Sequence, residues 1–211
     1  MKYALVTGGS RGLGRAVCQK LAAQGWPVLI NYQSNSAAAE ETLRSITKAG
    51  GQAELLQFDV SDPEQIEKAL ESWSASHPDD HIAVLVNNAG IRRDNLLVFM
   101  QNEEWHKVLD TTLNGFFYVT RRLLKEMLTH RWGRIVNIAS VRSFRPAEMN
   151  MIAYGVSKLG MHGLTRAFAE NGAPFGITAN AVCPGMVVTE NINRRLTPEK
   201  YREESAAIPL G

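Results

Sequence analysis

The sequence has little cysteine and no excess of one charge, and both shortages exclude classes of protein. Its only cysteines, Cys18 and Cys183, lie far apart, so there is no disulfide framework and no zinc spacing. Both are expected to be buried thiols in a reducing compartment. Basic residues number 23 and acidic residues 21, and neither sign forms a block that would favour a nucleic-acid partner.

Long apolar runs, targeting segments and linkers are missing too. No run approaches the roughly 20 apolar residues that cross a bilayer, and the apolar start is too short for a signal peptide. We therefore expect a cytoplasmic protein without a membrane partner. Arginine pairs such as Arg92-Arg93 and Arg121-Arg122 are expected to be solvated surface. Because no repeat or low-complexity segment divides residues 1–211, a single domain is expected.

What the sequence does contain is a series of short apolar runs that alternate with helical patterns. Each run is continuously apolar, as in strands covered on both faces of a parallel sheet, so a doubly wound α/β domain is predicted. The predicted strands are 4–6, 27–31, 53–58, 82–86, 134–138 and 177–182. The spacing of Ser61 and Glu64 is that of a capping box, which predicts a helix with Ser61 as its N-cap.

Residues 7–14 read Thr-Gly-Gly-Ser-Arg-Gly-Leu-Gly and stand between the first apolar run and an amphipathic stretch at 15–24. A strand, a glycine turn and a helix start in this order can cradle a pyrophosphate, because glycines allow positive φ and close approach of backbone N–H groups. A dinucleotide is therefore expected, and a ligand-free tight turn is the alternative. The candidate residues are Gly8, Ser10, Arg11, Gly12, Leu13 and Gly14.

Asn31 and Tyr32 end the second strand, and no carboxylate stands close behind them. A site for NAD has an acid at this place to accept hydrogen bonds from the ribose hydroxyls, whereas a 2′-phosphate needs cations and donors. Arg11, Ser34 and Asn35 supply these groups. The sequence therefore favours NADP as the cofactor.

Further candidates for cofactor contacts follow the third and fourth strands. Asp59, beside Val60, is placed to accept from an adenine amino group, or it simply caps the next turn. The small residues of Asn87-Asn88-Ala89-Gly90 allow close packing against an adenosine, and a plain asparagine-glycine turn is the alternative.

The predicted catalytic residues follow the fifth strand. Ser140 stands at the end of this strand, and Tyr154 and Lys158 come next on a predicted helix. Residues four apart share a helix face, so the Lys158 ammonium lies near the phenol of Tyr154 and makes it a stronger acid. This spacing alone is a weak signal, but Ser140 can hydrogen-bond the same substrate oxygen.

These motifs, together with Asn180-Ala-Val-Cys-Pro184-Gly185, resemble the short-chain dehydrogenase/reductase family over essentially the whole chain. Segments 90–100 and 103–105 are similar to the bacterial 3-oxoacyl-acyl-carrier-protein reductases of fatty acid synthesis. The resemblance implies a Rossmann fold, a homotetramer, and reduction of a carrier-protein-bound 3-oxoacyl thioester by NADPH. It makes Tyr154 the proton donor, lets Ser140 hold the substrate oxygen, and has Lys158 bind the nicotinamide ribose.

The resemblance also assigns Pro184, Gly185 and Val187, with Thr189 close by, to the grip on the nicotinamide carboxamide. Arg131 matches a position that meets the acidic carrier protein in these reductases, and a solvated surface arginine is the alternative.

The chain departs from the family pattern in three places. Thr112 stands where these reductases have an asparagine that anchors a proton-relay water, and Asn114, two residues on, is expected to face elsewhere. The loop 141–153 lacks the usual glycines and puts Tyr154 one residue farther from Ser140. The sequence also stops before the family's last helix and strand. Two alternatives therefore stay open: a reductase of another small ketone, alcohol or sugar, and a nucleotide-binding protein without catalysis.

Overall fold

The computed structural model describes residues 1–144, 150–189, 197–206 and 208. Strands alternate with helices along the chain, and the short segments labelled η are 3₁₀ turns except η2, which is π-helical. In order, the elements are β1 (Lys2–Val6), α1 (Gly12–Ala23), β2 (Val28–Tyr32), α2 (Ser36–Lys48), β3 (Ala53–Gln57), α3 (Pro63–Ser76), β4 (His81–Asn87), η1 (Leu97–Phe99), α4 (Asn102–Leu109), η2 (Asp110–Asn114), α5 (Gly115–Thr129), β5 (Gly133–Ile138), η3 (Val141–Ser143), α6 (Ile152–Gly172), η4 (Ala173–Phe175), β6 (Ile177–Val182) and α8 (Pro198–Ala206).

The six strands form one parallel sheet in the order β3-β2-β1-β4-β5-β6. The predicted strands lie within two residues of the observed ones, so the doubly wound α/β class is confirmed. The strand order reverses between β1 and β4, and ligands of such sheets bind beyond the carboxyl ends of the strands at this point. Val6 is level with Ile30 of β2 and Val86 of β4, which brings the segments after these strands to one edge.

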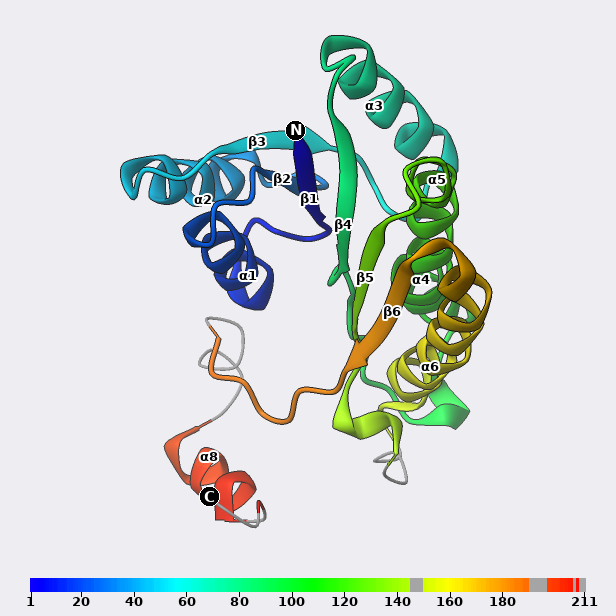
Figure 1. Ribbon diagram of the computed structural model, residues 1–211. Helices are drawn as coiled ribbons and strands as arrows, with labels where there is room; N and C mark the ends of the chain where they lie inside the picture. The colour runs from blue at the N-terminus through cyan, green and yellow to red at the C-terminus, as the bar shows by residue number, and fades with distance from the viewer. Residues whose placement is uncertain (145–149, 190–196, 207, 209–211) are drawn as a thin grey trace.

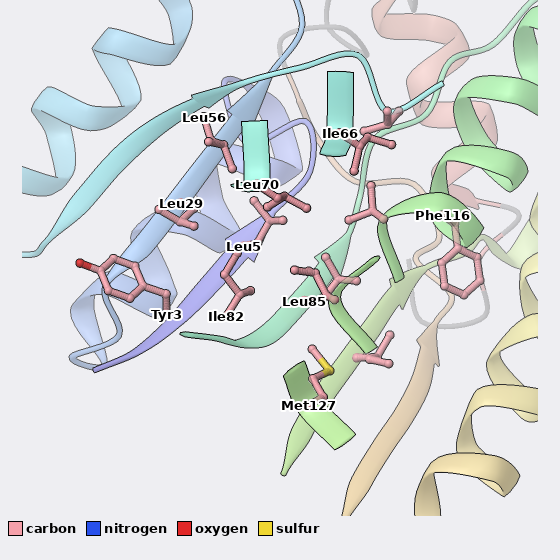
Figure 2. Packing of buried hydrophobic residues seen from close by; sticks show 14 of the residues in the cluster. Tyr3, Leu5, Leu29, Leu56, Ile66, Leu70, Ile82, Leu85, Phe116 and Met127 are labelled. Atoms are coloured by element: carbon pink, nitrogen blue, oxygen red, sulfur yellow. The ribbon is translucent and has the colours of Figure 1, made fainter. Parts of the chain in front are cut away.

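Helices cover both faces of the sheet, with α1 and α2 on one face and α3, α5 and α6 on the other (Figure 1). Successive residues of a strand point to opposite faces, so both sets need an apolar cover. Val6 packs in one cluster with Cys18 of α1. Leu5 packs in the other cluster, with Leu70 of α3 and Phe116 of α5 (Figure 2). This two-sided burial explains why the strands read as continuous apolar runs.

The start of helix α3 differs from the prediction. Its N-cap is Asp62, not Ser61, and the Asp62 carboxylate accepts hydrogen bonds from the backbone N–H groups of Glu64 and Gln65 at 3.0 and 3.1 Å. Ser61 instead donates its hydroxyl to Asp59 at 2.7 Å. The capping box is therefore wrong, because a charged acceptor one residue later satisfies the same N–H groups and also interacts favourably with the helix dipole.

Three further side chains can be compared with their expected burial. Cys18 is fully buried, and burial raises the pKa of its thiol to about 12. Cys183 is only half-buried, with its Sγ 3.8 Å from Nε2 of His162, so the expectation of a buried thiol is wrong there. Arg122 lies at the surface but is only partly solvated, since its side chain is 20% exposed and bonded to Glu67 at 2.8 Å. Within the described residues, no helix is both long and apolar enough to cross a membrane.

Candidate active site

The turn between β1 and α1 has the backbone geometry that its glycines predict. Gly8 and Gly12 have φ values of 63° and 54°, a region that side chains with a Cβ rarely adopt. A Cβ on Gly14 would stand 2.2 Å from the carbonyl oxygen of Gly8 and 2.6 Å from Nδ2 of Asn88. The turn therefore keeps its shape only with glycine at these positions, and it leaves backbone N–H groups at the N-terminus of α1 accessible.

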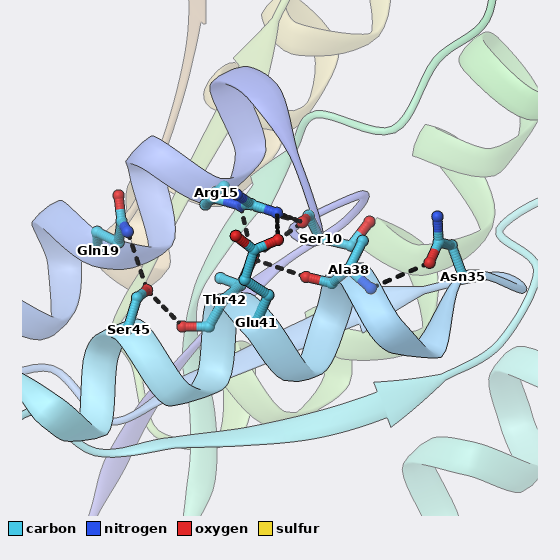
Figure 3. Close-up of polar contacts among 8 residues, drawn as sticks. All are labelled: Ser10, Arg15, Gln19, Asn35, Ala38, Glu41, Thr42 and Ser45. Carbon is cyan, nitrogen blue, oxygen red and sulfur yellow. Dashed lines mark hydrogen bonds and ion pairs between the residues drawn. The ribbon is translucent and has the colours of Figure 1, made fainter. Parts of the chain in front are cut away.

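Helix α2 holds this turn in place through the carbonyl oxygen of Ser10 (Figure 3). The oxygen accepts hydrogen bonds from Thr42 Oγ1 at 2.9 Å and from Arg15 Nη2 at 3.1 Å. Arg15 also donates to Thr42 Oγ1 at 3.0 Å and to the Glu41 carboxylate at 3.0 Å. We call Arg15, Thr42 and the Ser10 carbonyl the turn clamp. The sequence does not predict this clamp, because nothing in the local pattern pairs Arg15 with a residue of the next helix.

Asn31 fixes the other side of the turn. Its Oδ1 accepts from the N–H of Gly8 at 3.1 Å, and its Nδ2 donates to the carbonyl oxygens of Leu56 and Phe58 at 3.2 and 3.1 Å. The residue is 1% exposed. Asn31 therefore lines the cleft, and its side-chain amide connects the glycine turn to the end of β3 by hydrogen bonds.

A cleft of about 430 Å³ lies over the carboxyl ends of β1, β2 and β3. It brings together fifteen of the predicted cofactor residues: Gly8, Ser10, Arg11, Gly12, Leu13, Gly14, Asn31, Tyr32, Ser34, Asp59, Val60, Asn88, Ala89, Gly90 and Thr189. Asn35, named from the sequence as a phosphate donor, lines it too. Sequence analysis missed four lining residues, which are immediate neighbours of predicted ones or follow α4: Gln33, Phe58, Ile91 and Thr111.

The polar side chains of the cleft differ in whether they already have hydrogen-bond partners. Asp59 is the only carboxylate among the described lining residues, and it already accepts from the Ser61 N–H and hydroxyl and from Gln33 Nε2 at 2.5 Å. Asn35 caps α2 by accepting from the N–H of Ala38 at 3.0 Å. Arg11 has no side-chain partner among the described residues. The cleft thus presents an uncompensated cation beside the glycine turn, which suits an anionic ligand.

Asn87 lies outside the cleft. It is 3% exposed, and its Nδ2 donates to Thr120 of α5 and to Asn137 of β5, both at 3.0 Å. Asn137 in turn donates to Thr165 of α6 at 2.9 Å. These four residues form a buried polar network that joins two strands to two helices. Contact with an adenosine stays an untested prediction for Asn87, whose amide is used within the core.

Lys158 and Ser140 meet at the carboxyl end of β5. Lys158 is 4% exposed and donates from Nζ to the carbonyl oxygen of Ile138 at 2.6 Å. Burial lowers the pKa of this ammonium to about 8. Ser140 is 7% exposed, and its hydroxyl accepts from the N–H of Arg142 at 3.2 Å. Both side chains therefore lie at the strand end where the sequence pattern places them.

Tyr154 stands on the first turn of α6 with two cations beside its ring. Lys158 Nζ and the guanidinium carbon of Arg92 each lie 5.8 Å from the ring centroid. Arg92 comes from the segment after β4, and its side chain is 33% exposed. Arg92 is thus a partly exposed surface residue that also contacts the Tyr154 ring, whereas its neighbour Arg93 is exposed.

Gly90 joins the cleft to the catalytic residues. A Cβ at this position would lie 3.3 Å from Thr112 Oγ1 and 3.5 Å from Lys158 Nζ. Thr112 is 1% exposed, and its hydroxyl has no hydrogen-bond partner in the described part of the chain. Asn114 donates to Asp110 at 2.8 Å and faces away, as its rotation around the helix predicts. Thr112 is thus the side chain of this π-helical segment that points toward Lys158.

The segment after β6 returns to the glycine turn. The carbonyl oxygen of Pro184 accepts from the N–H of Val141 at 3.2 Å, next to Ser140. Gly185 has open space around it, and Val187 is 37% exposed. Farther on, the side chain of Thr189 comes within 3.7 Å of a Cβ placed on Gly12. Pro184 and Thr189 therefore lie at the catalytic and cofactor ends of the site.

The sheet, the glycine turn and the cleft define a Rossmann-type oxidoreductase that uses a nicotinamide cofactor, and the residues of the cleft fit such a group. Glycines with positive φ and the cation of Arg11 stand where a dinucleotide's phosphates need them. The chain belongs to the short-chain dehydrogenase family, whose model matches residues 2–200.

Several known proteins are similar to this chain. A 3-oxoacyl-[acyl-carrier-protein] reductase of Aquifex aeolicus is 38% identical over 212 residues, which cover 100% of this chain and 83% of the relative. An acetoacetyl-CoA reductase of Rhizobium meliloti is 39% identical and covered to 84%. The crystal structure of a protein provisionally assigned as a gluconate dehydrogenase of Agrobacterium tumefaciens superposes with a TM-score of 0.93 at 35% identity, over 99% of this chain and 81% of that one.

Proposed function

We propose that the protein reduces 3-oxoacyl thioesters, carried by acyl carrier protein, to 3-hydroxyacyl thioesters with NADPH in fatty acid synthesis. The observation that carries the proposal is the place of Lys158, which bonds the carboxyl end of β5 two residues before Ser140, lies 5.8 Å from the centre of the Tyr154 ring and adjoins Gly90 of the cleft. Relatives named as 3-oxoacyl-[acyl-carrier-protein] and acetoacetyl-CoA reductases act on this substrate class, and they are 37–40% identical to the chain.

In the proposed reaction a bound reduced nicotinamide would supply the hydride. Tyr154 donates its phenolic proton to the carbonyl oxygen as negative charge develops there, and Ser140 holds this oxygen with its hydroxyl. Lys158 stabilises the phenolate that remains. Burial of Lys158 strengthens this electrostatic effect, since a charge in a water-poor site acts more strongly on its neighbours.

NADP is the proposed cofactor rather than NAD. Arg11 lines the cleft beside Ser34 and has no side-chain partner among the described residues, so it is available to a 2′-phosphate. Tyr32 occupies the end of β2, where an NAD site has a carboxylate.

Two aspects of assembly belong to the same proposal. Arg131, with its guanidinium 5.6 Å from the ring of Phe175 and a hydrogen bond to Pro174, is the proposed contact for an acidic carrier protein. A homotetramer in the cytoplasm is also proposed. The assembly is supported by the exposed apolar residues Val156 and Leu159 on α6, which are 43% and 52% accessible in the isolated chain.

The test is consumption of NADPH with acetoacetyl-CoA and with an acetoacetyl carrier protein, beside NADH as the competing cofactor. We expect reduction with NADPH, and a loss of more than 100-fold in kcat for Tyr154→Phe with unchanged NADPH affinity. Arg11→Ala should raise the KM for NADPH about tenfold or more and leave that for NADH unchanged. A preference for NADH would overturn the cofactor assignment.

A reductase of another small ketone, alcohol or sugar is the second candidate. It is favoured by the structural similarity to the Agrobacterium protein and by the unusual loop between Ser140 and Tyr154, of which residues 145–149 lie outside the described part. Simple ketones are therefore tested in the same assay, and gluconate is tested in the reverse direction, by formation of NADPH from NADP⁺. If NADPH binds and no substrate reacts, the remaining alternative is nucleotide binding without catalysis.

A further inference from the structure

The segment between β4 and α4 brings an ion pair against the catalytic tyrosine. Arg92 donates from Nε and Nη2 to the two carboxylate oxygens of Asp94, at 2.9 and 2.6 Å. Such a bidentate pair fixes the plane of the guanidinium. The guanidinium carbon lies 5.8 Å from the centroid of the Tyr154 ring. Arg92 is therefore held in one place beside the phenol.

The segment that carries Arg92 is itself anchored on both sides. The N–H of Asn95 donates to the carbonyl oxygen of Asn150 at 2.9 Å, close to the start of α6, and its side chain donates to Glu104 of α4 at 3.1 Å. Glu104 also accepts from the N–H of Gln101 and closes the capping box of α4. One backbone and one side-chain hydrogen bond of Asn95 thus hold the segment that carries Arg92 against α4 and the start of α6.

The charged side chains near Tyr154 come from two elements. Its own helix supplies Lys158, and the segment after β4 supplies Arg92 with its partner Asp94. Among the described residues 184–189, after β6, none is ionisable. Because Arg92 is two-thirds buried, water screens its charge less than that of an exposed arginine. Arg92 favours negative charge on the phenol, and Asp94 opposes it.

We infer that Arg92 is a positioning residue for the reaction: paired with Asp94, it orients the Tyr154 ring and stabilises the phenolate left after proton donation. The inference rests on the proposed role of Tyr154. The proton goes from the Tyr154 hydroxyl to the carbonyl oxygen, so the phenol gains one negative charge during the step. A second cation near the ring lowers the energy of this state in addition to Lys158.

The test compares four variants: Arg92→Met, Arg92→Lys, Asp94→Asn and, as the matched control, the exposed Arg93→Met. Each is measured in two ways. The first is the pH dependence of kcat with NADPH and acetoacetyl-CoA. The second needs no substrate: the ultraviolet absorbance of the phenolate is titrated in each variant with and without Tyr154→Phe, and the difference isolates Tyr154.

We expect Arg92→Met to lower kcat about tenfold at neutral pH and to move the Tyr154 titration midpoint to higher pH. Asp94→Asn should move the midpoint in the opposite direction. Arg92→Lys, which keeps the charge and loses the bidentate pair, should lower kcat less than Arg92→Met, and Arg93→Met should change neither quantity. The KM for NADPH should stay within about twofold in all four, since Arg92 lies outside the cofactor cleft.

Opposite shifts for the two partners are the decisive result, because a merely structural ion pair would give the same change whichever partner is removed. If Arg92→Met and Asp94→Asn both lower kcat and leave the Tyr154 midpoint unmoved, the inference is overturned. The titration also separates this inference from the proposed function. If the wild-type protein reduces no thioester, the Tyr154 titration midpoint can still be measured. Its shift in Arg92→Met then still tests the role of Arg92.

Discussion

The Lys158 ammonium donates a hydrogen bond to the carbonyl oxygen of Ile138 at 2.6 Å, and no carboxylate in the described part of the chain pairs with it. A buried charge without a counter-ion destabilises the folded state, and the lowered pKa of Lys158 reports this cost. The protein therefore keeps a charge at the catalytic site at the expense of stability, as functional sites commonly do.

Lys158→Met should separate stability from activity. The methionine side chain has a similar length and no charge, so we expect the free energy of unfolding at pH 7 to rise by about 1–3 kcal/mol. Turnover should fall at least 100-fold. Urea denaturation and the NADPH assay check both effects, with the exposed Lys125→Met as the matched control. A destabilised Lys158→Met protein would contradict the account of an unpaired buried charge.

The pH dependence of stability follows from the same group. The pKa of Lys158 is about 8 in the folded state and 10.5 in an unfolded chain. Below pH 8 the lysine is protonated in both states, so it contributes no slope. Between pH 8 and 10.5 the unfolded state binds more protons, so the stability of the wild type should rise with pH, by at most about 3 kcal/mol. Denaturation curves of wild type and Lys158→Met at a series of pH values isolate this contribution, because the variant lacks it.

Thr112 offers a second test at the same place. Its buried hydroxyl has no hydrogen-bond partner among the described residues and faces the neighbourhood of Lys158. Replacing it by a methyl group in Thr112→Val should stabilise the protein by about 1 kcal/mol, because an unsatisfied polar group is removed from the core. If the hydroxyl supports proton supply to Lys158, kcat should fall several-fold in Thr112→Val and rise in Thr112→Asn. Equal kcat in all three proteins would exclude that role.

The sequence predicted those features that depend on local pattern. Strands buried on both faces need apolar residues at every position, so the continuous runs around Leu5 and Val86 were sufficient to place them. The glycine turn was equally clear, because positive φ at Gly8 and Gly12 restricts the residue type. Each of these signals lies within a few neighbouring residues.

Features that depend on contacts between distant segments could not be predicted in this way. Thr42 bonds the Ser10 carbonyl across 32 positions, and a buried threonine in a helix looks like any other core residue. The buried network of Asn87 with Thr120 could not be predicted either, because it depends on the alternation of side chains along β4 and on packing against α5. The contact of Arg92 with Tyr154 was not predicted, because charge alone does not reveal a neighbouring ring.

The turn clamp should matter for cofactor affinity rather than for fold. Thr42→Val removes one of the donors to the Ser10 carbonyl, so the glycine turn should lose part of its preorganisation and the Kd for NADPH should rise about three- to tenfold. Ser45→Ala is the matched control, since it removes a hydrogen bond from Gln19 between the same two helices without touching Ser10. Fluorescence titration with NADPH measures both. Equal Kd values for the two variants would show that the clamp has no special effect on the turn.

Alanine substitutions at two glycines of α6 should change stability differently, and the comparison also tests assembly. A methyl group added at Gly163 would have nothing within 4 Å, so Gly163→Ala should stabilise the isolated chain by about 0.5–1 kcal/mol through helix propensity. At Gly160 a Cβ would lie 2.9 Å from a methyl carbon of Leu113, which must shift to make room, so Gly160→Ala should be less stable than Gly163→Ala by about 1 kcal/mol. Thermal unfolding at two protein concentrations measures both. If Gly163→Ala instead destabilises, and more so at the concentration that favours oligomers, a second copy packs against this face of α6 beside Val156 and Leu159.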